Sequence, residues 1–548
     1  MKIVSFGENF LKKVFKGIDI ADKIVGSTLG PKGSHVAYEK YKNTYIINDG
    51  VTIIQELELS DPIENLGLNL IKEVAKKVND VVGDGTTTAV ILVSAIAKLG
   101  LNCRKEKLNV ALLSKYIEEV KDFLLKKLSS LSHSIDIKNA DLLSKVATIS
   151  CKDKFLGNLI STAYQEVGVD GLITVQESNS LDTFLTFTEG LEIQSGYISH
   201  HFVNDSNKME FFCSNVRILL VDSVLSSAEE MVKILNFVSS FPNSALLIVA
   251  EDIKGDAMTI FAYNRLRREW PIIGIKIPSV GQNKLSFLSD ISVLTGANII
   301  SKAKGMTFEK LKIEDFGIAE SVKINESKTI IIRSDSINKT EVGLKIKKLK
   351  EDFIKEKSEY KKSEIKQRIA HLSGKIAVIK VGAASEIEMK DKKLRLEDAI
   401  NSTFEALKAG IVSGGGATYV RLYKELQQYS SLNAGNDLNK KHIEYEKSIQ
   451  IMLFALLQPI KRLLANSQIE DAIVIKNILQ SSNSYIAFDV LNNKFVDALE
   501  HGIIDPTNVI KTIIIRSVSV ASLLLTAIAG ITEEKKTENK NIQNRMPF

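Results

Sequence analysis

The 548-residue sequence has only three cysteines, eight prolines and one tryptophan. Cys103, Cys151 and Cys213 lie far apart along the chain, a spacing that excludes a disulfide framework and a cluster of cysteine metal ligands. The sequence also lacks an unbroken run of about 18 apolar residues, the length of a membrane-crossing helix. Glu8 and Lys12 interrupt the N-terminal apolar stretch before it reaches the length of a signal peptide. We therefore expect a reducing compartment and no membrane partner.

Neither sign of charge dominates, because 72 Lys and Arg residues stand against 66 Asp and Glu residues. Aromatic residues are not interleaved with a basic patch, so we interpret the lysines as a solvated surface and expect no nucleic-acid partner. Apolar residues make up 44% of the chain and charged residues 25%, which is typical of a folded protein. The length exceeds what one hydrophobic core organises, so we expect several domains.

The spacing of apolar residues changes twice along the chain. Up to about residue 130, and again from about 409, apolar positions recur at helical spacing. Between about 188 and 374, short β-rich runs such as RILLVD and ALLIVAED alternate with helical stretches, which is typical of an α/β unit. Helical ends around an α/β middle predict that the middle is inserted into a domain built from both termini.

Residues 41–59 are expected to form a β-hairpin. Two β-branched runs flank Asn48-Asp49-Gly50 in the stretch YKNTYIINDGVTIIQELEL. An Asp-Gly pair between two such runs is a signal for a tight hairpin turn.

The stretch VVGDGTTTAVILVSAIAKLG, residues 81–100, places glycines, an acid and three hydroxyls where a helix begins. The N-terminus of a helix has unpaired N–H groups and a partial positive charge, which attract phosphate. Gly83 and Gly85 allow close approach of the backbone, and Asp84 is a hard oxygen ligand suited to Mg²⁺. The alternative is that Asp84 or Thr86 only caps the helix.

A second glycine cluster, SGGGA at 413–417, also precedes a helical stretch. Three glycines leave a backbone without side chains, which can lie against a flat ligand such as a nucleotide base. A flexible hinge would have the same composition. The sequence has neither GxxxxGK[ST] nor a strand-linked GxGxxG, so a nucleotide site here belongs to another architecture.

Six motifs occur in one order: TLGPKG at 28–33, NDGVT at 48–52, GDGTTTA at 83–89, VGAASEIEMKDKKLRLEDA at 381–399, SGGGA at 413–417 and GIIDPT at 502–507. Together they resemble the GroEL-type (group I) chaperonins, the 60 kDa ATP-driven protein-folding rings. The resemblance runs from about residue 3 to residue 533.

The resemblance implies a multidomain α and α/β fold, with a mainly helical equatorial domain, a small intermediate domain and an inserted α/β apical domain. The implied limits are equatorial 1–130 and 409–530, intermediate 131–187 and 375–408, apical 188–374, and a polar disordered tail 531–548. It also implies a heptameric ring, two stacked rings, a ten-kilodalton co-chaperonin lid and unfolded polypeptides as substrates. The expected location is the cytoplasm of a bacterium, with an organelle matrix as the alternative.

The same resemblance assigns roles to site residues. Asp398 would be the catalytic carboxylate that acts on the attacking water once the intermediate domain swings down, and Asp49 a second acid near that water. Asp84 would hold Mg²⁺. The remaining ATP contacts that it implies are Thr28, Leu29, Gly30, Pro31, Asn48, Gly85, Thr86, Thr87, Thr88, Gly414, Gly415, Asp489, Val490 and Asp505.

Two helical stretches, 229–241 and 256–269, carry more apolar residues than one buried stripe needs. The first has Met231, Ile234, Leu235, Val238 and Phe241 on one stripe, with Val232 outside it. An apolar stripe alone indicates ordinary core, whereas apolar residues beyond it leave a surface for a second contact. The resemblance implies that such a surface captures unfolded chains, through Tyr197, Phe202, Val232, Leu235, Met258, Ala262 and Tyr263.

Several positions depart from the family pattern, among them His201, which replaces a tyrosine in the apical groove. Asn48 stands where the family usually has a lysine, Asp489 where it has an asparagine, and Ser195 where it has an arginine. Loss of the lysine charge predicts weaker ATP binding or slower hydrolysis. The departures also support a second hypothesis, a holding or adhesion protein with weak ATP turnover. A third possibility, an unrelated phosphotransferase, has no sequence feature in its favour.

Overall fold

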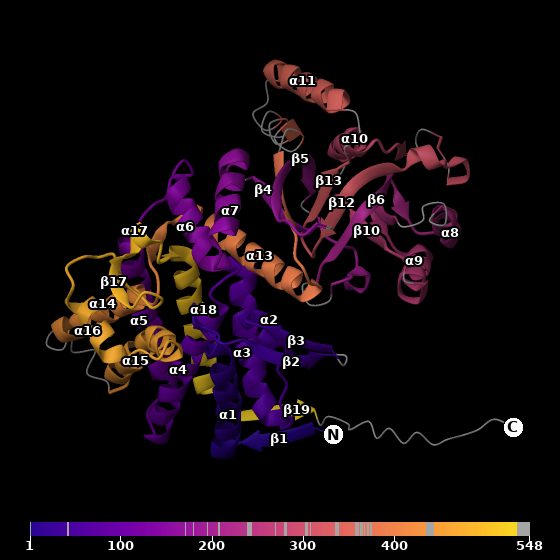
Figure 1. The fold of residues 1–548 in the computed structure, drawn as a ribbon. Coiled ribbons are helices and arrows are strands. Elements are labelled where there is room, and N and C mark those ends of the chain that lie inside the picture. The colour runs from indigo at the N-terminus through magenta and orange to yellow at the C-terminus, as the bar shows by residue number, and fades with distance from the viewer. Residues whose placement is uncertain are drawn as a thin grey trace. The chain divides into compact units, whose positions relative to one another are not determined.

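The computed structural model describes residues 2–533 except 41–42, 170, 179, 194, 206–208, 238–243, 269, 279–281, 302–304, 307, 335–338, 434–442 and most positions between 357 and 374. The chain forms two compact units (Figure 1). Unit 1 comprises residues 1–165, 175–184 and 380–548, and unit 2 comprises residues 166–174 and 185–379. The expected nesting of an α/β part between two helical parts is therefore found. The finer division into equatorial and intermediate domains stays a prediction.

Unit 1 is mainly helical, and its core lies among helices from both ends of the chain. Helix α18 packs against α3, α4 and α5, while α15 packs against α4 and α5. The helices are α1 (Gly7–Gly26), α2 (Gly50–Glu56), α3 (Pro62–Val82), α4 (Thr86–Lys105), α5 (Val110–Leu131), α6 (Ala140–Cys151), α7 (Lys154–Val167), α13 (Glu386–Ala409), α14 (Ala417–Asn433), α15 (Ile443–Asn466), α16 (Asp471–Gln480), α17 (Ala498–His501) and α18 (Thr507–Thr526).

Three of these helices, α4, α15 and α18, are long and apolar enough to cross a membrane by length and composition alone. None of the three contains an unbroken apolar run of 18 residues, because polar residues are scattered along each helix. In this fold α4 packs against both α15 and α18, and 67%, 56% and 67% of the most apolar windows of the three helices are buried. Their apolar residues supply the core of unit 1.

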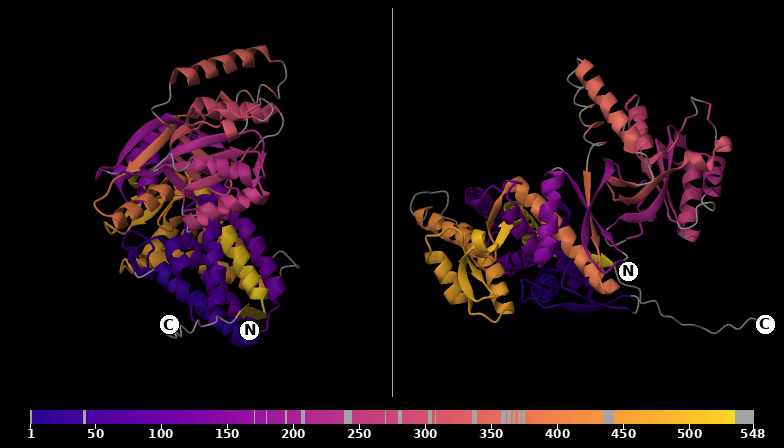
Figure 2. Two further views of the ribbon diagram at one scale, coloured as in Figure 1. Left: turned by 90° about the vertical axis from the view of Figure 1, so that its right-hand side faces the viewer. Right: turned by 45° about the horizontal axis from the view of Figure 1, so that its top comes forward.

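Four small antiparallel sheets complete unit 1. They pair β1 (Lys2–Phe6) with β19 (Ala529–Glu533), β2 (Val36–Lys40) with β3 (Asn43–Ile47), β15 (Ile411–Ser413) with β18 (Ile504–Pro506), and β16 (Ile486–Asp489) with β17 (Lys494–Asp497). The first pair joins the two ends of the described chain, and both views of Figure 2 show indigo and yellow segments together in this unit.

The expected hairpin over 41–59 is wrong. The hairpin lies earlier, between β2 and β3, and residues 50–56 form helix α2. The carboxylate of Asp49 accepts the backbone N–H of Thr52 at 2.8 Å and that of Val51 at 3.3 Å, and so caps this helix. A short β-branched run does not distinguish strand from helix, and here the cap decided the outcome.

Unit 2 is built on a sheet of nine strands in the order β10-β8-β6-β12-β13-β5-β14-β4, with β11 paired to β6. Strands β6, β8 and β10 are parallel, whereas β12 pairs antiparallel with β6 and β13. The strands are β4 (Leu172–Glu177), β5 (Phe184–Ile193), β6 (Phe211–Val221), β8 (Ala245–Ala250), β10 (Ile272–Lys276), β11 (Ile299–Ile300), β12 (Gly317–Ile324), β13 (Thr329–Arg333) and β14 (Lys375–Val381), beside a small pair β7 (Val224–Leu225) and β9 (Asp252–Ile253).

The helices of unit 2 are α8 (Ala228–Asn236), α9 (Gly255–Arg268), α10 (Gln282–Thr295) and α11 (Lys339–Lys355), with short 3₁₀ turns at His200–Phe202, Phe308–Lys310 and Ile313–Asp315. Strand β8 is buried along its whole length, as its apolar run predicts for a strand covered on both faces. The fold class, a helical part with an α/β part, is confirmed.

Candidate functional site

A cavity of about 1050 Å³ lies within unit 1. Its walls come from the α1–β2 loop, the start of α2, the α3–α4 junction, α6, α13, the glycine turn before α14, and the segment around β16 and β18. Among the residues predicted to bind nucleotide or to act on it, the following line the cavity: Thr28, Leu29, Gly30, Pro31, Asn48, Asp49, Asp84, Gly85, Thr86, Thr87, Thr88, Asp398, Gly415, Asp489, Val490 and Asp505.

The α3–α4 junction requires two glycines. Gly83 ends α3 with φ 67° and Gly85 precedes α4 with φ 80°, in the left-handed region that favours glycine. A Cβ on Gly83 would lie 2.3 Å from Nδ2 of Asn401, and one on Gly85 would lie 2.6 Å from Cδ1 of Ile513. The turn therefore packs against α13 and α18 at distances that a side chain would prevent.

No side chain caps α4, although every residue of its first turn is described. Its first N–H groups are left for another acceptor, and Thr86, Thr87 and Thr88 line the cavity there. The alternative that Asp84 or Thr86 merely caps this helix is thus not supported. An uncapped helix N-terminus with three hydroxyls is suited to binding an anion such as phosphate.

Asp84 is held by hydroxyls from two other helices. Its Oδ2 accepts hydrogen bonds from Oγ of Ser150 on α6 and Oγ of Ser402 on α13, each at 3.0 Å. Its Oδ1 accepts the N–H of Gly85 at 2.5 Å. Neither serine was predicted, because the sequence offers no local motif that links residues so far apart. The carboxylate that could hold a cation is thereby oriented by three donors.

Asp398 lies on α13 and lines the same cavity as Asp84. The expectation that the intermediate domain must swing down before Asp398 acts on the attacking water stays a prediction. Arg395 and Asp391, one and two turns earlier on α13, form an ion pair at 2.6 Å and also line the cavity. Lys152, just after α6, completes this charged wall, and the sequence reasoning missed it.

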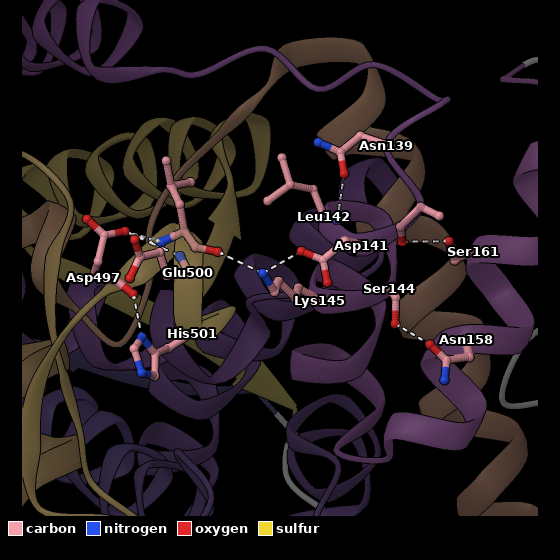
Figure 3. A network of polar contacts seen from close by, with 12 residues as sticks. Asn139, Asp141, Leu142, Ser144, Lys145, Asn158, Ser161, Asp497, Glu500 and His501 are labelled. Atoms are coloured by element: carbon pink, nitrogen blue, oxygen red, sulfur yellow. Dashed lines mark hydrogen bonds and ion pairs between the residues drawn. The ribbon is translucent and has the colours of Figure 1, made fainter.

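Helix α6 is anchored to its neighbours by the polar contacts in Figure 3. Nζ of Lys145 lies 2.5 Å from Oδ2 of Asp141 on the same helix and 3.3 Å from the carbonyl oxygen of Leu499 on α17. On the other side, Oγ of Ser144 donates to Oδ1 of Asn158 on α7 at 2.6 Å. The contacts to Leu499 and Asn158 hold in place the helix that carries Ser150 and is followed by Lys152.

Asp505 and Tyr419 form a second, more apolar part of the cavity wall. Burial, with a smaller contribution from the Asp84 carboxylate, raises the pKa of Asp505 to about 7. Tyr419 is 3% exposed, and among the described residues its hydroxyl has no hydrogen-bond partner. A buried hydroxyl without a partner is costly, so a polar ligand in the cavity would satisfy it.

The opposite wall is shaped by the loop after α1. Gly30 has φ 89°, and a Cβ there would lie 2.1 Å from Leu463 Cδ1. The carbonyl oxygen of Leu29 accepts a hydrogen bond from Nδ2 of Asn466 at 3.0 Å. The hydroxyl of Thr28 donates to the carbonyl oxygen of Val25 at 2.8 Å, so this side chain is used within the loop.

The glycine turn differs from expectation in one residue. Gly414 is not among the cavity residues: its N–H donates to the carbonyl oxygen of Ile503 at 2.7 Å, and a Cβ would lie 2.9 Å from the N atom of Ile504. It is a packing residue, and Gly415 and Gly416, both with positive φ, line the cavity instead. The positive φ of Gly415 and Gly416 explains why glycines occupy these positions of the second cluster.

Asp489 lines the cavity but closes the turn between β16 and β17. Its Oδ1 accepts the N–H of Leu491 at 2.9 Å, and its Oδ2 accepts Nδ2 of Asn492 at 2.7 Å. Although burial opposes it, this set of hydrogen bonds lowers the pKa of Asp489. The carboxylate is thus engaged in the turn. Val490, next to it, adds an apolar side chain to the cavity wall.

In unit 2, the predicted capture residues separate into two groups. Phe202 is 0% exposed and packs edge-on against Phe261 with ring centroids 4.8 Å apart, and Leu235 is 4% exposed. These two predictions are wrong for direct contact, since both side chains belong to the core beneath α8 and α9. Val232 and Tyr263 are 44% and 58% exposed. Tyr197, Met258 and Ala262 are partly buried against the same core, and Val238 and Phe241 lie outside the described residues.

The residues of the cavity fit a nucleotide with Mg²⁺. Mg²⁺ is usually held by one or two carboxylates together with phosphate oxygens and waters. Asp84 supplies such a carboxylate beside the uncapped start of α4. No group of three or more His, Cys, Asp or Glu side chains suited to a metal occurs in the described part of the chain, so a bound cation would need the phosphate oxygens.

Comparison with known proteins agrees with this geometry. The profile of the TCP-1/cpn60 chaperonin family matches residues 21–535. The fold resembles that of the chaperonin gp146 from the bacteriophage EL 2 (Pseudomonas aeruginosa), solved in two crystal forms in the presence of ATP-BeFx. The TM-scores are 0.64 and 0.61, at 19% identity over 97% of this chain and 100% and 99% of those chains. The match spans nearly the whole sequence, and this chain belongs to the TCP-1/cpn60 chaperonin family.

Proposed function

We propose that this chain is a group I chaperonin that binds ATP with Mg²⁺ in the unit 1 cavity, captures unfolded polypeptides on unit 2, and uses hydrolysis to time their release. The observation that carries the proposal is the cavity in which Asp84, Asp398 and the uncapped start of α4 meet. The ATP-BeFx present with the similar phage chaperonin supports a nucleotide as its ligand.

The phosphates would lie against the first turn of α4, where N–H groups and the hydroxyls of Thr86–Thr88 can donate to them. Mg²⁺ at Asp84 would bridge phosphate oxygens and neutralise charge that develops on them. The base and ribose would lie between Gly415, Val490 and Asp505, with the Tyr419 hydroxyl as a further donor. Ser150 and Ser402 keep the Asp84 carboxylate in place.

Asp398 would orient and deprotonate the water that attacks the terminal phosphate. Asp49 also lines the cavity, but its carboxylate accepts from the backbone of α2 and from Oγ1 of Thr52 at 2.5 Å. Asp49 would therefore place a fixed negative charge at the site. As the cap of α2, it would also hold the neighbouring Asn48 in position.

Unfolded chains would bind at an apolar surface made of Val232 on α8 and Tyr263 and Leu266 on α9, all more than two-fifths exposed. Apolar contact is not directional, so it suits a binder of many sequences. We propose the same surface for a ten-kilodalton co-chaperonin lid. A heptameric ring, single or stacked, is proposed from family membership. The exposed Phe6, Ile46 and Ile531 on the small sheets, and Ile528 just before β19, are suited to contacts between subunits.

Asp398→Ala tests the proposal in a coupled ATPase and refolding assay with and without a co-chaperonin. We expect ATP and an unfolded substrate still to bind while hydrolysis falls at least about 100-fold, the size of a general-base contribution. Asp122→Ala, at an exposed position on α5, is the matched control and should hydrolyse ATP normally. Unchanged hydrolysis in the Asp398 variant would contradict the assigned role.

The alternative, a holding protein with weak turnover, is favoured by the engagement of Asp489 in its turn and by the neutral Asn48. It predicts that the wild-type chain suppresses aggregation equally well with and without ATP. A dependence of refolding yield on ATP hydrolysis would exclude this alternative. A native mass measurement with and without ATP decides between a ring and a single subunit.

A further inference from the structure

Lys152, the residue that follows α6, lines the cavity proposed to bind the nucleotide. Nζ of Lys152 donates a hydrogen bond to Oδ1 of Asn48 at 2.8 Å, although 104 positions separate the two residues. Both line the cavity together with Asp84 and Asp398. The ammonium of Lys152 therefore lies next to position 48, where the family resemblance implies a lysine and this chain has a neutral amide.

The backbone of Lys152 is in an unusual conformation for a lysine. It caps the C-terminal end of α6 with φ 59° and ψ 23°, and its N–H donates to the carbonyl oxygen of Thr148 at 2.8 Å. This left-handed conformation is unfavourable for an L-residue with a side chain, and glycine or asparagine is the usual residue there. The cap itself gains nothing from a lysine side chain, and Lys107 has a similar φ of 61°, so the argument for Lys152 depends on where its ammonium lies.

The charges around Lys152 leave it available for an anion. Lys145 binds the carboxylate of Asp141, and Arg395 binds that of Asp391, whereas the hydrogen-bond partner of Lys152 is the uncharged Asn48. The side chain is accessible because it faces the open cavity, yet the surrounding walls partly desolvate it.

Desolvation and the neighbouring Arg395 lower the pKa of Lys152, while Asp391, Asp84 and Asp398 oppose this shift. An anion held close to a partly desolvated ammonium interacts with it more strongly than it would in bulk water. The terminal phosphates of a nucleotide are such an anion.

We propose that Lys152, oriented by Asn48, supplies the cation that contacts the terminal phosphates of the bound nucleotide. This inference rests on the proposed function of the cavity and goes beyond it, because it transfers the phosphate-binding charge from position 48 to a residue on another element. It also reverses the expectation from the sequence, since Asn48 then serves as a support for the cation and does not weaken ATP binding.

The test compares Lys152→Asn, Asn48→Lys and the double variant Asn48→Lys/Lys152→Asn. Asparagine tolerates the left-handed conformation, so the α6 cap should survive in both Lys152 variants. Binding of ATP with Mg²⁺, and of uncharged adenosine, is measured by calorimetry, together with ATP hydrolysis. Lys138→Asn, at an exposed lysine before the other end of α6, is the control.

We expect Lys152→Asn to weaken ATP binding about 10- to 100-fold, the range for a hydrogen bond from a charged group, and to leave adenosine binding unchanged. The double variant should regain most of the lost affinity, because a lysine at position 48 restores a cation beside the same phosphates. Lys152→Gly should be at least as resistant to thermal unfolding as the wild type, since glycine suits the conformation, yet should also bind ATP weakly.

Equal ATP affinity of the wild type and Lys152→Asn would overturn the inference while leaving the proposed function intact. An equal loss for ATP and adenosine would also overturn it, because it would indicate a structural role. Absence of ATP binding in the wild type itself would remove the proposed function and this inference with it.

Discussion

Oγ of Ser402 donates to Oδ2 of Asp84 at 3.0 Å, across 318 positions of sequence. The contact joins α13, which also carries Asp398, to the α3–α4 junction. A single hydrogen bond thus ties the helix of the proposed catalytic carboxylate to the carboxylate proposed to hold Mg²⁺. Any displacement of α13 would therefore change the environment of both acids.

Removing this hydroxyl should weaken Mg²⁺ binding. We expect Ser402→Ala, and Ser150→Ala likewise, to raise the Mg²⁺ concentration needed for half-maximal ATP binding about tenfold, because groups that orient a metal ligand have effects of this size. A titration of Mg²⁺ at fixed ATP measures the change. Ser130→Ala removes an exposed hydroxyl that donates to the carbonyl oxygen of Lys127 on its own helix, and this variant should behave as the wild type. An identical Mg²⁺ requirement in all variants would exclude the orienting role.

Asp505 should make the stability of the chain depend on pH. Its folded pKa of about 7 lies above the value of about 3.9 for an unfolded aspartate, so the folded chain binds more protons between these values. The protonated Asp505 therefore contributes to the free energy of unfolding. The contribution is fully present below about pH 4 and is lost as pH rises towards and through 7.

Asp505→Asn removes that dependence. We expect the unfolding free energy of the variant, relative to the wild type, to rise by about 1–2 kcal/mol from pH 5 to pH 8, after allowance for solvent screening. Urea unfolding without nucleotide or Mg²⁺ at the two pH values measures it. The same difference at both values would show that the carboxyl does not titrate in this window.

Gly83→Ala should reduce both stability and Mg-ATP affinity. Gly83 combines a positive φ with a close approach to Asn401, whereas Gly7 has φ 60° and no neighbour within 4 Å of the position that a Cβ would take. We expect Gly7→Ala to have only the backbone effect of about 1 kcal/mol, and Gly83→Ala to lose more, up to about 3 kcal/mol. Thermal unfolding of the two variants separates the cost of the backbone conformation from the cost of the contact with Asn401. An equal loss of stability in both variants would contradict a close approach at Gly83.

Phe202 and Val232 should respond differently to truncation. Phe202→Ala should lower the unfolding free energy of unit 2 by about 3–5 kcal/mol, since a fully buried ring leaves a cavity. Val232→Ser should change stability by less than about 0.5 kcal/mol, but should weaken capture of an unfolded polypeptide. Thr259→Ala, at an exposed polar position on α9, is the control for capture. Normal capture by Val232→Ser would remove α8 from the proposed surface.

Local chemistry made several features predictable. The start of α4, the glycines at 83 and 85 and the strands of unit 2 follow from residue spacing and backbone preference, which act over a few positions. Burial of Met231 and Ile234 also follows from the apolar stripe on α8. The error at 41–59 has the same local origin, because the run after Asp49 is compatible with strand and helix, and the Asp49 cap selects the helix.

The sequence by itself therefore determined the glycine turn before α4, the order of helical and α/β parts and the family. Only the tertiary structure decided which groups line the same cavity as that turn: Ser150 and Lys152 at the end of α6, Ser402 on α13 and Tyr419 on α14. It also decided that Phe202 and Leu235 are core residues, whereas Val232 and Tyr263 are surface. The physical reason is that hydrogen bonding and burial depend on distance in space, and packing of the helices and the sheet sets those distances for residues that are remote in sequence.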